Sequence, residues 1–100
     1  MITIKTFQDG TELILFLADK KFTGYGHYQI SVELMYRGQE KTFKATTTNM
    51  EAIDDSREAG VESWEEAKII LYEAIQYQIE ETVQDWMNDV DYELSQILKI

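Results

Sequence analysis

Hydrophobic and polar residues alternate along the first half of the chain. The alternation is clearest from Tyr28 to Tyr36, where every second residue is hydrophobic, as expected of a strand with one buried face. Three further segments rich in strand-forming residues lie at Ile2–Phe7, Glu12–Ala18 and Lys41–Thr48. The pattern therefore predicts four strands within residues 1–49.

Glycines predict the turns that join these strands. Asp9-Gly10 is typical of a two-residue hairpin turn, since both central residues need positive φ, which Asp tolerates and Gly adopts freely. This turn would place Leu15 opposite Ile4, with Leu17 on the same core-facing side of the sheet.

Two more connections complete the predicted sheet. A two-residue turn around Gly38 would set Phe43 opposite Val32. The glycine-containing segment 19–26 is expected to form a longer loop between the two hairpins. Together these turns indicate an antiparallel meander, in which each strand pairs with the next one along the chain.

The second half of the chain has the period of a helix, because hydrophobic residues recur every three or four positions. The stripe consists of Leu71, Ile75, Ile79, Val83, Trp86, Val90, Leu94 and Ile97. Ser63 and Glu66 fit a capping box, in which the Ser hydroxyl accepts the Glu amide hydrogen and the Glu carboxylate returns to the Ser amide. An unbroken helix over 64–98 would be about 50 Å long, so we expect either a break at Asn88–Asp91 or an end that extends beyond the sheet.

The stretch between the predicted sheet and the predicted helix has many charges and few hydrophobic residues. Residues 50–61 are therefore expected to be a linker, with at most a single helical turn at Met50–Ile53. A chain of 100 residues with 44% hydrophobic content is long enough for one core and too short for two. The predicted fold is a single α+β domain over residues 1–100. It has two layers, a four-stranded antiparallel β-meander (1–49) and a long or broken C-terminal helix (62–100) packed on one face.

Charge is divided unequally between the two halves. Residues 1–49 carry five acids and six Lys or Arg residues, whereas residues 50–100 carry fourteen acids and three Lys or Arg residues. The whole net charge of −10 therefore lies in the C-terminal half. Such a surface attracts cationic partners and repels phosphate, which argues against direct nucleic-acid binding.

Seven of these acids are predicted to follow neighbouring tracks on the exposed side of the helix, and we call them the acidic ridge. The acidic ridge consists of Glu62, Glu66, Glu73, Glu80, Glu81, Asp85 and Asp89. Carboxylates on successive turns can meet the Lys and Arg side chains that normally hold phosphates, so the ridge is a candidate for binding a basic protein surface. The alternative is a solvated face that only gives solubility.

The predicted register leaves hydrophobic side chains on the other face of the sheet. Ile14 would lie opposite Lys5 on that face. Phe7 and Phe16 would point the same way, and exposed hydrophobic patches of this kind often mark protein contacts. These three hydrophobic residues form a candidate oligomer patch, most simply of a symmetric homodimer. The alternative is that a loop at residues 20–26 folds over the patch.

Catalytic motifs are missing from the sequence. His27 is the only histidine, there is no cysteine, and neither a Gly-x-Ser-x-Gly elbow nor a glycine-rich loop that opens a helix is present. Asp89–Glu93 resembles the start of a calcium-binding loop, but Leu94 and Ile100 replace the glycine and the glutamate that such a loop needs. The sequence therefore predicts no enzyme, no cofactor and no metal site.

The N-terminal segment has no basic stretch followed by a hydrophobic run, so it is not read as a signal peptide. No hydrophobic run approaches the ~20 residues that a membrane-spanning helix needs. We therefore expect a cytoplasmic protein without a membrane partner.

The leading hypothesis is a non-catalytic protein–protein interaction domain. It would occupy a basic surface of a partner protein, as an inhibitor or nucleic-acid mimic of the anti-restriction or anti-defence type. Small size, acidity and hairpins before a helix are shared by many unrelated proteins, among them phage-encoded inhibitors of host defence. The alternative is a structural homo-oligomer subunit whose acidity gives only solubility.

Overall fold

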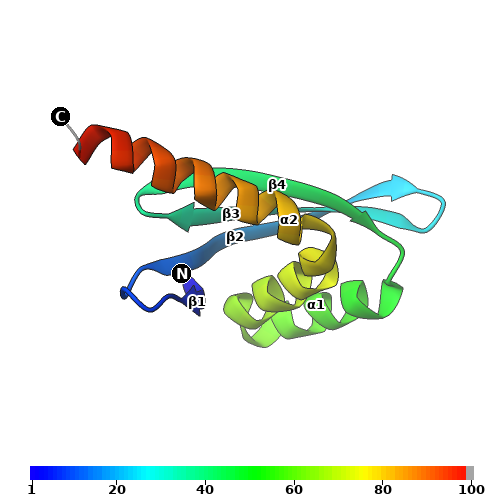
Figure 1. Ribbon diagram of the computed structural model, residues 1–100. Coiled ribbons are helices and arrows are strands. Elements are labelled where there is room, and N and C mark those ends of the chain that lie inside the picture. The colour runs from blue at the N-terminus through cyan, green and yellow to red at the C-terminus, as the bar shows by residue number, and fades with distance from the viewer. Residues whose placement is uncertain (99–100) are drawn as a thin grey trace.

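A four-stranded antiparallel sheet forms one layer of the structure and helices form the other (Figure 1). The computed structural model describes residues 1–98. The strands follow the order β1-β2-β3-β4, with bounds Ile2–Thr6, Glu12–Gly24, His27–Tyr36 and Gln39–Thr47. The helices are α1 (Met50–Glu62) and α2 (Trp64–Leu98). The predicted α+β meander with a long helix packed against it is confirmed.

The loop between β1 and β2 is longer than the predicted two-residue turn. The Phe7 N–H donates to the Thr11 carbonyl at 2.8 Å, and the Gly10 N–H donates to the Phe7 carbonyl at 3.0 Å. Within this loop only Gly10 has a positive φ, +86°, whereas Asp9 does not. This is the geometry of a three-residue loop, a type I turn followed by a left-handed glycine. The prediction of a two-residue turn is wrong, and the two strands are shifted by one residue.

A β-bulge in β1 then decides which side chains face the helices. Thr3 pairs with Ile14 and Lys5 pairs with Leu13, so Ile4 is the extra residue. Because an extra residue interrupts the alternation of side chains, Lys5 shares the helix-covered face with the buried Leu13. The prediction that Lys5 lies opposite Ile14 on the other face is wrong.

A second bulge lies in β2. Leu15 pairs with Leu34, but Leu17 pairs with Glu33, so Phe16 is the extra residue. Leu15 is fully buried, whereas Leu17 lies on the face away from the helices and is 45% exposed. The prediction that Leu17 belongs to the core is therefore wrong, because the bulge reverses the side on which the following residues lie.

The segment 19–26, predicted as a loop, is strand up to Gly24. Tyr25 and Gly26 form a two-residue turn with φ values of +52° and +74°, as a type I′ turn requires. The β2–β3 hairpin therefore extends past the helices as an arm (Figure 1). The β3–β4 turn at 37–38 is also of this type, and Phe43 pairs with Val32 as predicted.

Residues 50–61, predicted as a linker, belong to helix α1. Its first turn is capped by Asn49, whose side-chain oxygen accepts the Ala52 amide hydrogen at 3.1 Å. Ile53 and Ser56 are its buried residues. Small side chains along the inner face allow close packing on α2, so the helix forms with little hydrophobic content.

Ser63 alone connects the two helices. Its hydroxyl accepts the Glu66 amide hydrogen at 3.2 Å, as predicted, and its own N–H donates to the Ala59 carbonyl at 2.6 Å. The second half of the predicted capping box is wrong, because the Ser63 N–H already serves to close α1. Ser63 thus ends one helix and starts the next.

Helix α2 is continuous from Trp64 to Leu98, and the alternative of a break at Asn88–Asp91 is wrong. Val90 is buried within that segment, and Asn88 accepts a hydrogen bond from the Gln84 side chain. The predicted stripe is buried from Leu71 to Val90, whereas Ile97 is 64% exposed. The C-terminal end of α2 therefore extends beyond the sheet (Figure 1).

The core lies between the sheet and α2. Trp86 belongs to this core, edge-on to Phe43 at 5.5 Å and to Tyr36 at 6.2 Å between ring centroids. The Tyr36 hydroxyl donates to the Asp91 carboxylate at 2.8 Å, and Arg37 pairs with Asp91 at 2.9 Å. These contacts join α2 to the end of the sheet where β3 meets β4.

Candidate functional site

All seven carboxylates of the acidic ridge are exposed. The ion pairs formed within residues 1–98 use four other carboxylates, namely Asp9, Asp54, Glu65 and Asp91. Within that part of the chain, no lysine or arginine neutralises a ridge residue. The ridge therefore presents its full charge to solvent.

The structure divides the acidic ridge into two parts. Glu62 and Glu66 lie in a shallow groove between α1 and α2, together with Asp55 and Glu58. Glu73 lies in the adjoining hollow, with Glu51 and Asp55. Helix α1 thus adds Glu51, Asp55 and Glu58 to the acidic surface. The sequence analysis missed them because it read their segment as a linker.

The signal for these three residues was present in the spacing of the acids. Glu51, Asp55, Glu58 and Glu62 follow steps of four, three and four, which is one face of a helix. A polar stripe with helical spacing indicates a helix in the same way as a hydrophobic stripe. On the buried face of α1, Ile53 is accompanied by small residues such as Ser56, so the hydrophobic signal was too short to reveal the helix.

The second part of the ridge lies further along α2. Glu80, Glu81 and Asp85 surround a shallow hollow that also contains Tyr77, which is exposed. Asp89 continues the track by one more turn. Carboxylates four residues apart on a helix are separated by about 6 Å along its axis and destabilise it by a few tenths of a kcal/mol per pair. The buried stripe on the other side of α2 must offset that repulsion.

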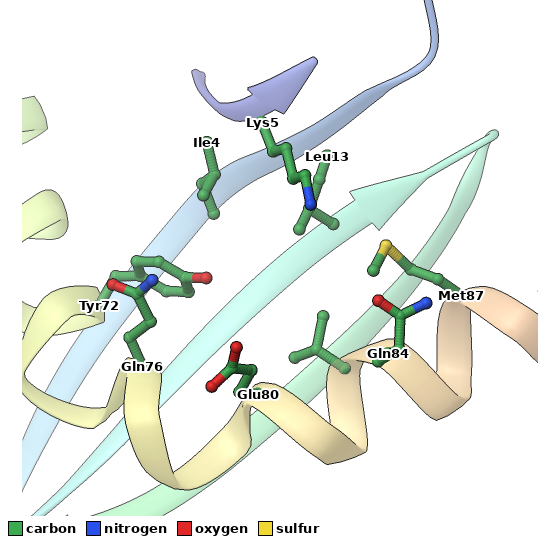
Figure 2. A pocket seen from close by; sticks show the side chains of 9 residues that line it. Ile4, Lys5, Leu13, Tyr72, Gln76, Glu80, Gln84 and Met87 are labelled. Carbon is green, nitrogen blue, oxygen red and sulfur yellow. The ribbon is translucent and has the colours of Figure 1, made fainter. Parts of the chain in front are cut away.

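A separate cleft lies between β1 and α2 (Figure 2). It comprises two adjoining hollows of about 210 and 320 Å³, which share Ile4, Tyr72 and Gln76. Lys5 enters the first hollow from the strand side and Glu80 from α2. Burial, together with the negative charge of Glu80, raises the pKa of the Tyr72 hydroxyl.

The residues of the candidate oligomer patch are not brought together. Phe7 packs against the core, edge-on to Tyr36 with ring centroids 5.8 Å apart, so the prediction that it points away from the core is wrong. Ile14 pairs with Met35 on the face that the helices leave uncovered. Phe16 is half-buried in the β2 bulge.

Residues 20–26 do not cover this face, since they belong to the β2–β3 arm and its turn. The alternative in which a loop folds over the patch is therefore wrong. An oligomeric role for the patch remains a prediction.

Within residues 1–98, no group of three or more His, Asp or Glu side chains is arranged to hold a metal ion. None of the helices in the described part of the chain combines the length and the hydrophobic content needed to cross a bilayer. The chain matches no family model, and neither a curated protein nor a solved structure matches it.

Proposed function

We propose that this protein is a non-catalytic interaction domain whose acidic helical layer binds a basic surface of a partner protein, in the manner of a nucleic-acid mimic. The observation that carries the proposal is that the seven ridge carboxylates are exposed and have no ion-pair partner within residues 1–98. Unpaired surface carboxylates in such number give a negative potential that attracts Lys and Arg clusters.

The charge density supports a comparison with nucleic acid. Residues 50–98 carry fourteen carboxylates against Arg57 and Lys68, and the longest dimension of the molecule is 51 Å. Since the N-terminal amine and Arg37 also pair with Glu65 and Asp91, ten net charges remain, or about one per 5 Å, compared with about 3.4 Å per phosphate in one DNA strand. The helical layer thus approaches the charge density of a single strand.

The way in which arginine recognises oxygen anions also supports the comparison with nucleic acid. Arginine binds carboxylate and phosphate oxygens with the same planar pair of N–H donors, so a groove built for phosphates accepts carboxylates. The partner class that fits is a nucleic-acid-binding protein, and occupation of its groove would inhibit it. Inhibitors of restriction or of other host defences act on partners of this kind.

The test compares two variants with equal net charge. Neutralising Glu81, Asp85 and Asp89 to the corresponding amides removes three ridge charges and keeps side-chain size. Neutralising Glu12, Glu33 and Glu40 removes three charges from the sheet instead. Both proteins and the wild type are immobilised, and proteins captured from a lysate at low salt are identified as salt is raised.

We expect the wild type to capture nucleic-acid-binding proteins that added DNA displaces. Capture should fall about tenfold or more for the ridge variant and by less than about twofold for the sheet variant, because contact between opposite charges dominates such binding. Equal losses for the two variants, or partners that DNA does not displace, would remove the proposal.

A further inference from the structure

Helix α2 does not pack equally on all four strands of the sheet. Helix α2 packs against β2, β3 and β4 but stands back from β1, which is the edge strand. At the opposite edge, the Gln78 side chain donates to the Thr46 carbonyl of β4 at 3.0 Å. At the β1 edge, two hollows lie between the strand and α2.

The side chains of α2 that face this edge form a row. Tyr72, Gln76, Glu80 and Gln84 follow one another at steps of four residues and line the two hollows beside β1 (Figure 2). The strand side of the hollows is hydrophobic, with Ile2, Ile4, Leu13 and Leu15. A hydrophobic floor with a few polar groups at its rim is the usual character of a binding cleft.

Tyr72 supplies a hydrogen-bonding group to this cleft. The residue is 8% exposed, and its hydroxyl points into the first hollow (Figure 2). No group within residues 1–98 forms a hydrogen bond with that hydroxyl. The hydroxyl oxygen is in contact with solvent in the hollow, since within residues 1–98 every fully buried polar side-chain atom has a hydrogen-bond partner. The hydroxyl is thus available to a ligand.

The charges in the cleft favour a cation. Among residues 1–98, Glu73 is the only charged residue that lines the second hollow. In the first hollow, Lys5 faces Glu80, but its ammonium group lies 5.1 Å from the centre of the Phe7 ring and forms no ion pair with Glu80. The bulge at Ile4 gives Lys5 this position. Both carboxylates on the helix side therefore remain available for a positive charge.

We propose that β1 receives an extended segment of a partner protein as a fifth strand, with alternate side chains in the two hollows and a Lys or Arg at Glu80 and the Tyr72 hydroxyl. An edge strand offers unpaired backbone groups, and adjoining clefts give side-chain specificity. Side chains two residues apart in a strand lie about 6.6 Å apart on one face. A Lys or Arg stem can lie along the hydrophobic floor while its charge reaches the rim.

A partner segment fits better than a second copy of this chain. Each copy carries a net charge of −10, and pairing two β1 strands would bring the Glu73 and Glu80 carboxylates of both copies towards one another. Glu73 and Glu80 belong both to the acidic ridge and to this cleft, whereas Glu81, Asp85 and Asp89 lie outside it, so the inference goes beyond the proposed function in its ligand and in the use of β1.

The experiment uses an acetylated and amidated peptide of sequence TKTVTKT, which presents Lys, Val and Lys on one face in either strand direction. Binding is followed by NMR with ¹⁵N-labelled protein and by amide hydrogen exchange. We expect saturable shifts at residues 2–6, Tyr72 and Gln76, and slower exchange of amides in β1. Two further peptides carry N-methyl groups on alternate residues, and at least one of them should bind about tenfold more weakly.

Protein variants then test the individual contacts. Tyr72→Phe and Glu80→Gln should each weaken peptide binding about tenfold, since each removes one hydrogen-bonding or charged group. Tyr77→Phe and Glu81→Gln are the matched controls, because both residues are exposed on the same helix outside the hollows, and they should change affinity by less than about twofold. The Glu81, Asp85 and Asp89 neutralisation variant should keep peptide binding, which separates this site from the proposed ridge function.

Three results would overturn the inference. The first is the absence of saturable shifts in β1 at millimolar peptide, which would mean that the bulge and Lys5 keep this edge from pairing. The second is binding of both N-methylated peptides with the affinity of the unmodified peptide. The third is slower exchange of β1 amides with rising protein concentration alone, which would identify a second copy as the occupant.

Discussion

Two leucines in β2 provide the sharpest test of the structure. Leu15 and Leu17 are two residues apart, so regular alternation would give them the same environment. The bulge at Phe16 separates them: Leu15 is fully buried against the helices, and Leu17 is 45% exposed on the other face. Replacement of each by alanine removes the same atoms from opposite sides of the sheet.

The expected losses of stability differ in size. At a fully buried site, Leu→Ala costs about 3–5 kcal/mol, because the transfer energy of the removed atoms is lost and a cavity remains. At Leu17 about half of the removed surface is already in contact with water and no closed cavity forms. We therefore expect the free energy of unfolding to fall by about 1 kcal/mol for Leu17→Ala. The difference of about 2–4 kcal/mol corresponds to a shift of 1 M or more in the urea midpoint.

The fluorescence of Trp86 can be used to follow unfolding. Trp86 is 8% exposed and belongs to the core, whereas the second tryptophan, Trp64, is 76% exposed. In a Trp64→Phe background, fluorescence during urea unfolding therefore reports the core alone. The measurement is repeated at two protein concentrations, because a role of Leu17 in self-association would make its effect depend on concentration. Equal losses for Leu15→Ala and Leu17→Ala would refute the bulge and the assignment of faces that depends on it.

Two further outcomes follow from the helix cap and from the buried tyrosines. Asn49→Ala should lower the free energy of unfolding by about 1 kcal/mol, because the cap to the Ala52 amide is lost; urea unfolding measures this, and no change would mean that α1 does not begin there. Burial raises the pKa of Tyr36 and Tyr72 above 10.0, so the folded state keeps these protons at a pH where the unfolded state has lost them. Stability should therefore be insensitive to these groups below about pH 9 and fall as pH rises through their folded-state pKa, and Tyr72→Phe should reduce that dependence. An unchanged slope in Tyr72→Phe would contradict the assignment for Tyr72.

The sequence predicted the elements whose period is long and regular. The stripe from Leu71 to Val90 and the alternation in β3 each repeat one spacing many times, and both are found as predicted. The face of β4 was also predictable, because a two-residue loop near Gly38 in either position puts Phe43 on the same face as Val32.

The bulges could not be predicted in the same way. The strand from Glu12 to Ala18 is hydrophobic on both faces, so inserting an extra residue at Phe16 leaves no polar residue in a buried position. The choice of register is then made by packing across the sheet and against α2. The positions of Lys5 and Phe7, and with them the cleft beside β1, depend instead on the three-residue loop before β2 and on the bulge at Ile4.

The acidic surface was predicted only in part. The ridge on α2 followed from the helical spacing of the hydrophobic stripe, which fixes the exposed side. Helix α1 was missed because its inner face is made largely of small residues, such as Ala59 and Gly60, which pack closely without a strong hydrophobic signal.

The single-residue connection at Ser63 limits how this protein can evolve. Each residue of a helix turns the chain by about 100°, so one residue inserted beside Ser63 would rotate α1 relative to α2 by more than a quarter turn. Glu51, Asp55 and Glu58 would then leave the groove that they share with Glu66 and Glu73. Related chains should therefore vary the acids of the groove by substitution while keeping the length of the helical hairpin constant.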